Sequence, residues 1–211
     1  MMQHPKTDRA ARTRDALLSA GFDLMLDRSI DAIPIDELVA AAGVGKGSFF
    51  NHFGDKEGFK AALAIQVRGE IETKITTANL GVTEPLERLA GGMREVTDYA
   101  LNNRKRTISM LRMMVGSTGR EYPLNEGVRS DIALCIDANL IRAKSQHSAM
   151  LFWLGLCVAL ITHVVEVDLA RKPAAEMLGE FLLSGLIGLG ADEATSREIA
   201  QRFSRELASG S

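Results

Sequence analysis

The spacing of apolar residues, three and four positions apart through almost the whole chain, constrains the fold more than any other feature. Such spacing places apolar side chains along one face of an α-helix. Only 5 of the 211 residues are proline, the residue that interrupts helices. No segment alternates apolar and polar residues over enough positions to predict a strand. The sequence therefore predicts an all-α protein.

The helical pattern divides into short segments followed by longer ones. Pro34 suits the first turn of a helix, and Gly43 and Gly54 suit positions directly after helix ends. Loops are expected at Tyr122-Pro123 and Lys172-Pro173. The first expected helix begins near residue 7 or 8, and the others cover residues 34–42, 46–53, 55–75, 84–102, 105–116, 125–144, 147–170, 174–189 and 193–208.

These segments indicate two domains. The three short helices at the front form one domain over residues 8–54, and a larger helical body covers residues 55–208. The helix Asp55–Ile75 belongs to the body and connects it to the front domain.

Composition limits the classes of function. The chain has 25 Lys and Arg against 27 Asp and Glu, so its net charge of -2 excludes a protein that coats nucleic acid by bulk charge. The 4 histidines are too scattered to suggest a metal site, and the spacing assembles no nucleophile–base–orienter set. We therefore expect neither an enzyme nor a cofactor. The N-terminus lacks the apolar stretch of a signal peptide, so a cytoplasmic location is expected.

The two cysteines, Cys135 and Cys157, lie in apolar stretches of sequence. Two cysteines can form at most one disulfide, which is too few to stabilise a chain of this length, so reduced and buried thiols are expected. A redox-sensing thiol is the alternative, but no basic residue adjoins either cysteine to favour its thiolate.

The segment from Lys46 to Phe53 has two different sides when drawn as a helix of about 100° per residue. Phe49 and Phe53 fall on the apolar side. The opposite side carries small and hydrogen-bonding residues: Gly47, Ser48, Asn51 and His52. After a helix and a glycine turn, this pattern is typical of a helix-turn-helix, whose second helix enters the major groove of DNA. A purely structural hairpin is the alternative.

Basic and small residues around this segment are the other expected DNA contacts. Lys46 and the N–H groups of the first helical turn would bind phosphates, and Gly45 would let the duplex approach closely. Lys56 would bind a flanking phosphate. The preceding arm adds local positive charge through Lys6, Arg9, Arg12 and Arg14.

The stretch AAGVGKGSFFNHFGDKEGF, which begins at Ala41, resembles the DNA-binding signature of the TetR (tetracycline repressor) family. The similarity extends from Arg12 to about Ala64 and includes the first-helix pattern LLSAGFDLM. It implies a helix-turn-helix domain followed by a helical body that binds a ligand and dimerises. The expected DNA-binding residues are Arg12, Arg14, Gly45, Lys46, Gly47, Ser48, Phe50, Asn51, His52 and Lys56.

Two positions depart from the family pattern. Phe50 stands where the family usually has tyrosine, so the ring is kept while a hydroxyl that can bond a phosphate is lost. Ile33-Pro34 stands where the family often has Thr-Ser, which puts one phosphate contact near Ile33 in doubt and leaves the fold unaffected.

Residues 145–165 contain no Asp, Glu, Lys or Arg, a run long enough to raise the question of a transmembrane helix. Polar residues shorten its apolar core and no anchoring pattern flanks it, so a membrane partner is not expected. A helix apolar all round must be buried on every side, which favours a subunit interface over a monomer core. TetR-like proteins similarly dimerise through their last long helices. The expected dimer interface comprises Leu151, Gly155, Ala159, Phe181, Gly185 and Gly188.

Methionines and aromatic residues of the body suit an adaptable apolar pocket. Ordinary core packing explains any single methionine equally well, and His163 is expected as a hydrogen-bonded core histidine ahead of a ligand contact. The resemblance implies a pocket in the body, so we expect a small, mainly apolar effector. The expected lining residues are Tyr99, Met110, Met113, Met114, Phe152, Trp153 and His163.

The sequence thus predicts a homodimeric, ligand-responsive transcriptional regulator, a repressor rather than an activator, that binds a palindromic operator in double-stranded DNA. An effector is expected to shift the orientation of helix 55–75 and so the spacing of the two recognition helices. The alternative is a helical small-molecule-binding or scaffolding dimer that has lost DNA binding, which Phe50 and the balanced charge of the front end leave open.

Overall fold

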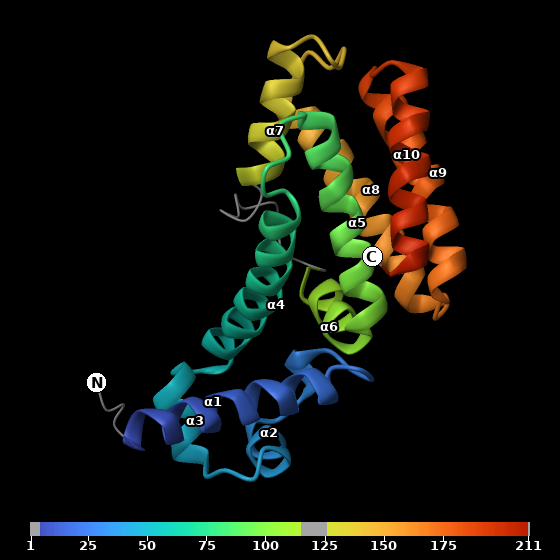
Figure 1. Ribbon diagram of the computed structural model, residues 1–211. Helices are drawn as coiled ribbons and strands as arrows, with labels where there is room; N and C mark the ends of the chain where they lie inside the picture. Colours follow the sequence, from blue (N-terminus) through green and yellow to red (C-terminus); the bar gives the residue numbers. More distant parts are fainter. Residues whose placement is uncertain (1–4, 115–125, 211) are drawn as a thin grey trace. The chain divides into compact units, whose positions relative to one another are not determined.

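The computed structural model describes residues 5–114 and 126–210, which form ten α-helices and one short 3-10 helix with no strand among them (Figure 1). The all-α prediction is confirmed. The elements are α1 Pro5–Leu24, η1 Ile30–Ala32, α2 Ile35–Ala41, α3 Lys46–Phe53, α4 Lys56–Ala78, α5 Pro85–Asn102, α6 Arg104–Met114, α7 Glu126–Asp137, α8 Gln146–Glu166, α9 Arg171–Leu189 and α10 Glu193–Ser209.

The chain divides into two compact units. The first contains α1, η1, α2, α3, the part of α4 up to Arg68, and α6 from Lys105 onward; the second contains the rest. This division differs from the expected domains 8–54 and 55–208 because α6 packs on the end of α1. The Ser109 hydroxyl lies 3.5 Å from the Phe22 carbonyl oxygen, and the Lys105 ammonium lies 2.9 Å from the Asp23 carboxylate.

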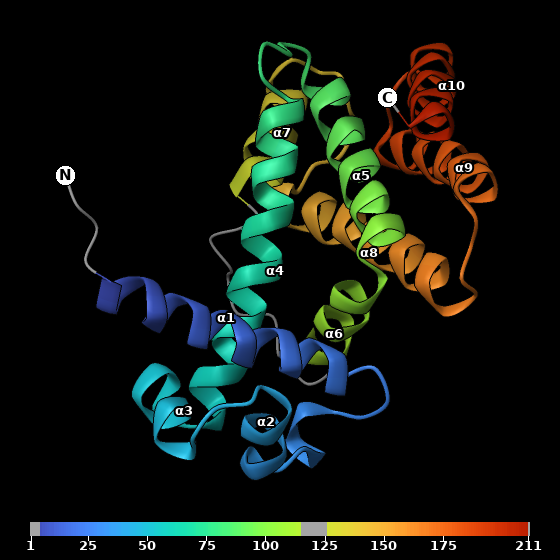
Figure 2. The same ribbon diagram turned by 60° about the horizontal axis from the view of Figure 1, so that its bottom comes forward.

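Aromatic packing holds the first unit together. α1, α2 and α3 contact one another, and Figure 2 shows α2 and α3 side by side against α1. Phe49 of α3 is fully buried, and the Phe59 ring of α4 lies 5.2 Å from Phe49 and 4.8 Å from Phe53, centroid to centroid. Gly21 of α1 makes room for this cluster, because a Cβ there would lie 2.7 Å from Phe59 Cζ. The apolar side predicted for residues 46–53 therefore anchors α3 in its unit.

The second unit is a helical bundle in which α9 lies along α10, and α5 contacts α7, α8 and α10 (Figure 1). The hydroxyl of buried Tyr99 donates to the Glu70 carboxylate at 2.5 Å, which joins α5 to the end part of α4. The neighbouring Asp98 carboxylate lies 2.8 Å from Arg171 of α9 and 3.5 Å from Lys74 of α4. Ion pairs and apolar packing therefore position α4, α5 and α9 within this unit.

α8 carries apolar residues around its whole circumference, but only one of its faces is buried. The helix is long and apolar enough to cross a membrane, with a mean hydropathy of 2.1. The core helices of soluble proteins can be equally long and apolar, so this property alone does not indicate a membrane span. Its buried face consists of Ala149, Trp153, Leu160, Ile161, Val164 and Val165. Its opposite face exposes Leu151, Phe152, Gly155, Ala159 and His163.

The expected boundaries of three helices are wrong. α8 ends at Glu166 instead of continuing to residue 170, and Asp168 beyond it is left-handed with φ of 54°. α7 ends at Asp137 instead of continuing to residue 144, because Asn139 is left-handed with φ of 55° and the Leu140 N–H donates to the Cys135 carbonyl at 2.8 Å. Pro173 lies in the first turn of α9 instead of a loop. N–H groups in a first turn lack partners within the helix, so proline fits there. The loop expected at Tyr122-Pro123 lies outside the described residues.

Candidate nucleic-acid interface

A helix, a tight turn and a second helix form the candidate interface. α2 ends at Ala41, and Gly43 follows with φ of +65°, in the left-handed region that favours glycine. The Val44 N–H then donates to the Val39 carbonyl at 3.0 Å and closes the turn. Gly45 is the N-cap of α3 and has no side chain to cap the first turn. The first N–H groups of α3 therefore remain for an acceptor outside the helix.

The burial of α3 follows the two-sided pattern of its sequence. Phe49 faces the core, whereas Gly47 and Asn51 are exposed and 44% of Phe50 is exposed. Ser48 and His52 are half-buried at the edge of the same face. The side of α3 that points away from the core thus offers hydrogen-bonding groups around one exposed aromatic ring.

Gly45 and Gly47 are not needed by the fold around them. Neither has a positive φ, and a Cβ at either position would lie more than 4 Å from every described neighbour. Inside a helix, where Gly47 lies, glycine is less favourable than alanine by about 0.5–1 kcal/mol. Two glycines that the chain's own packing does not require are typical of a surface where another molecule approaches the backbone.

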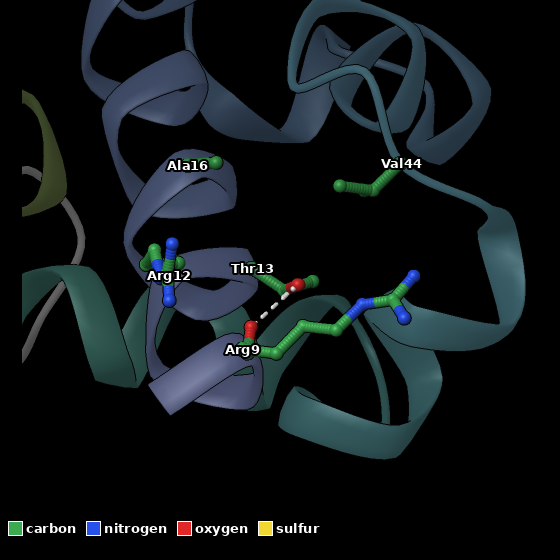
Figure 3. Close-up of a pocket in the computed structure, with 5 residues that line it drawn as sticks. All are labelled: Arg9, Arg12, Thr13, Ala16 and Val44. Atoms are coloured by element: carbon green, nitrogen blue, oxygen red, sulfur yellow. Dashed lines mark hydrogen bonds between the residues drawn. The ribbon is translucent and has the colours of Figure 1, made fainter. Parts of the chain in front are cut away.

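An open groove of about 510 Å³ lies between α1 and the turn before α3. Its lining residues are Arg9, Arg12, Thr13, Ala16 and Val44. Figure 3 shows the extended Arg9 side chain crossing from α1 towards the turn that carries Val44. The Thr13 hydroxyl donates to the Arg9 carbonyl at 3.0 Å. The groove therefore places the Arg9 guanidinium near the turn before α3, with Arg12 also among its lining residues, which suits a phosphate-bearing chain.

Arg9 was expected only as part of the positively charged arm, and its place beside Arg12 follows from the sequence. Positions 9, 12, 13 and 16 follow the spacing of one helix face, so Arg9 lies beside Arg12. Arg14, another expected DNA contact, places its guanidinium 5.8 Å from the centre of the Phe53 ring. Arg14 therefore stacks on the aromatic cluster of its own unit.

The expected phosphate-binding lysines have partners within the chain. The Lys46 ammonium lies 2.7 Å from the Asp36 carboxylate of α2. The Lys56 ammonium donates to the Asp31 carbonyl of η1 at 2.8 Å. The Asp31 carboxylate also accepts from Lys60 at 2.9 Å, and this hydrogen bond lowers the pKa of Asp31 and raises that of Lys60. Acidic groups are thus interleaved with the cations of this surface.

The expected pocket residues belong to both compact units. Tyr99 and Trp153 are buried in the second unit, whereas Met110 and half-buried Met113 belong to the first. The side chain of Met114 lies outside the described residues.

His163 and Phe152 are exposed, so the expectation of a core histidine is wrong. The reason is helical register, because Leu160, Ile161 and Val164 take the buried side of α8.

The expected interface residues fall into two groups. Leu151, Gly155, Ala159 and Gly188 are exposed and, with Phe152 and Ile187, form a continuous set on neighbouring helices that we call the α8–α9 face. Gly185 is buried instead, and a Cβ there would lie 2.9 Å from Leu156 Cδ1. Gly185 therefore serves the packing of α8 on α9 within one chain, and Phe181 is half-buried beside it.

Both cysteines are reduced thiols in low-polarity surroundings. Burial, with a smaller effect of Asp131, raises the pKa of Cys135 to about 12, and burial raises the pKa of Cys157 to about 12. Neither is a thiolate at neutral pH, which argues against redox sensing through these groups. Within the described ranges, no three His, Cys, Asp or Glu residues are grouped so as to hold a metal ion.

Comparison with known proteins identifies the front of the chain. Residues 17–63 match the profile of the family described as bacterial regulatory proteins, tetR family. The chain is 32% identical over 95 residues to the HTH-type transcriptional repressor NemR of Escherichia coli (strain K12), covering 45% of this chain and 42% of NemR. It is 27% identical over 126 residues to the HTH-type transcriptional repressor DhaR of Mycobacterium sp. (strain GP1), covering 58% of this chain and 60% of DhaR. The chain thus spans about half the length of these curated relatives.

The fold has solved counterparts. The structure of AibR in complex with isovaleryl coenzyme A and operator DNA aligns with a TM-score of 0.62 and 18% identity, over 80% of this chain and 97% of AibR. At this level of identity the likeness concerns the fold.

Proposed function

We propose that the chain is a member of the TetR family and acts as a ligand-responsive, DNA-binding transcriptional regulator of the cytoplasm, because residues 17–63 match the profile of that family. It acts as a repressor, binds a palindromic operator as a homodimer, and is released by a small, mainly apolar effector. The observation that carries the proposal is the pair of open glycines at the start of α3, directly beside the exposed side of that helix.

α3 is the recognition helix of this proposal. Asn51 and Ser48 contact base edges, while Lys46 and the first N–H groups of α3 contact phosphates. The groove lined by Arg9 and Arg12 takes the adjoining stretch of DNA backbone. Gly45 and Gly47 let the duplex approach without a steric clash.

The α8–α9 face is the dimer interface. The exposed fraction is 56% for Leu151 and 42% for Ile187, which leaves apolar surface for a second copy to cover. Gly155 and Ala159 permit close approach of helices across a two-fold axis. Two recognition helices about 34–36 Å apart then read both halves of a palindrome.

Release follows from a population shift. An effector bound in the helical body favours one orientation of α4. This orientation changes the distance between the two recognition helices of the dimer, so that they no longer fit into adjacent major grooves. The coupling required is about 1–3 kcal/mol between effector and operator. AibR, whose structure contains both isovaleryl coenzyme A and operator DNA, offers a precedent for a fold of this kind.

Fluorescence anisotropy tests the proposal directly. Labelled duplexes from the region upstream of the protein's own gene and of random sequence are titrated at several salt concentrations. We expect the upstream duplex to bind at least about a thousandfold more tightly. We also expect affinity to fall as salt rises, with a log–log slope of about -0.9 per phosphate contacted. Flat curves for every duplex would refute DNA binding.

A helical scaffolding or small-molecule-binding dimer without DNA binding is the second candidate. The ion pair between Lys46 and Asp36 favours this second function, because the Asp36 carboxylate neutralises an ammonium group that would otherwise bind a DNA phosphate. Flat anisotropy curves together with a dimeric mass in solution would support this second function.

A further inference from the structure

An ion pair joins the two helices of the candidate interface. The Lys46 ammonium, on the first residue of α3, lies 2.7 Å from the Asp36 carboxylate in the first turn of α2. The exposed fractions of the two side chains are 53% and 73%, so both ends of the pair are open to solvent. Whatever binds at the start of α3 therefore meets both charges.

The Asp36 carboxylate and a DNA phosphate would compete for the Lys46 ammonium group. If the phosphate takes the place of the carboxylate, the ion pair is lost. If both anions bind one ammonium, they lie close together and repel each other. In either arrangement Asp36 weakens the contact between Lys46 and the DNA backbone.

Neighbouring acids have other partners. Glu37, one residue further along α2, pairs with Arg28, and Asp31 pairs with Lys60. Among the ion pairs of the described residues, the one between Asp36 and Lys46 links α2 to the first residue of α3. Asp36 is thus placed to act on the start of α3, and Glu37 serves as a nearby carboxylate with a different partner.

We propose that Asp36 limits the affinity of the DNA interface: it restrains Lys46 and so weakens binding to DNA of any sequence. This inference rests on the proposed function. Backbone contacts supply most of the affinity for arbitrary DNA, whereas base contacts supply discrimination. Because a backbone contact forms with DNA of any sequence, its weakening lowers affinity for every duplex, and a random-sequence duplex is a suitable probe.

The test is a double-mutant cycle on the full-length protein with a random-sequence duplex of 30 base pairs, chosen to be about three helical turns long. The variants are Asp36→Asn, Lys46→Ala and the double variant, with circular dichroism melts to establish that each is folded. We expect Asp36→Asn to bind the random duplex about 2–5-fold more tightly at low salt, as suits an exposed ion pair. Its log–log salt slope should steepen by up to about 0.9, the value of one complete phosphate contact. In the Lys46→Ala background the same substitution should change the affinity little.

Glu37→Gln is the matched control, because it removes the same charge from the same helical turn. We expect it to leave the salt slope unchanged, and an equal effect of both substitutions would show that net charge alone matters. Wild-type binding that Asp36→Asn does not strengthen would overturn the inference and leave the proposed function intact. No binding by the wild type or by Asp36→Asn would overturn both. Binding that appears only in Asp36→Asn would support the restraint.

Discussion

Replacement of Gly47 by alanine separates the needs of the fold from the needs of the DNA interface. Gly47 is the second residue of α3, is exposed, and has a helical backbone with no atom within 4 Å of the added Cβ. Alanine is more favourable than glycine in a helix by about 0.5–1 kcal/mol. For a chain of this size that corresponds to a rise in Tm of about 1–4 °C.

The same methyl group should weaken DNA binding, because it occupies the space through which the duplex approaches α3. Inserting a methyl group into a closely packed contact costs about 1–3 kcal/mol, or roughly 5–150-fold in Kd. Thermal melts by circular dichroism measure the first effect, and anisotropy titration with the upstream duplex measures the second. Gly47→Ala should therefore be more stable and bind DNA less tightly.

Gly127→Ala is the matched control. Gly127 is also the second residue of a helix, α7, is also exposed, and a Cβ there would also have no described residue within 4 Å. It should stabilise the protein by a similar amount and leave DNA binding unchanged. Wild-type affinity in Gly47→Ala would refute the argument that DNA comes close to this glycine. A lower Tm in Gly47→Ala would refute the argument that the fold does not require glycine at position 47.

Three further predictions concern the exposed ring, the α8–α9 face and one carboxylate. Phe50→Tyr should tighten operator binding by about 0.5–1.5 kcal/mol, through a phosphate hydrogen bond measured by titration, and unchanged or weaker binding would contradict this. Leu151→Glu should convert a dimer to a monomer in sedimentation experiments, whereas Leu134→Glu, at a 49% exposed leucine of α7, should not; a dimeric Leu151→Glu variant would place the interface elsewhere. Burial opposes the ionisation of Asp98, but Arg171 prevails and the pKa of Asp98 is lowered from 3.8. The contribution of Asp98 to the free energy of unfolding is therefore fully present above pH 3.8, and it is lost as the pH falls through the lowered pKa. Asp98→Asn should make unfolding less sensitive to acid in this range, and an unaltered pH profile would contradict the assignment.

Helical periodicity predicted the secondary structure well because it depends on neighbours within one turn. The spacing of phenylalanines in residues 46–53 placed one face of α3 inward, and Phe49 is fully buried. The errors arose at helix ends, where one residue decides the outcome. Asn139 adopts a left-handed conformation and ends α7, and Pro173 fits in the first turn of α9.

The candidate site was only partly predictable. The polar face of α3 follows from its own sequence, whereas the partners of its cations do not. Asp36 and Lys46 are ten positions apart on different helices, so their pairing depends on how α2 crosses α3. Likewise, Arg9 reaches the start of α3 because α1 lies beside the turn that carries Val44.

The sequence by itself determined the helices, the turn at Gly43 and the inward phenylalanines, because these depend on dihedral preferences and burial over a few neighbouring residues. Tertiary structure alone decided that α6 joins α1, that Gly185 packs inside one chain, that His163 is exposed and that Asp36 holds Lys46. Such contacts depend on the crossing of helices far apart in sequence, and helical spacing carries no information about which helices cross.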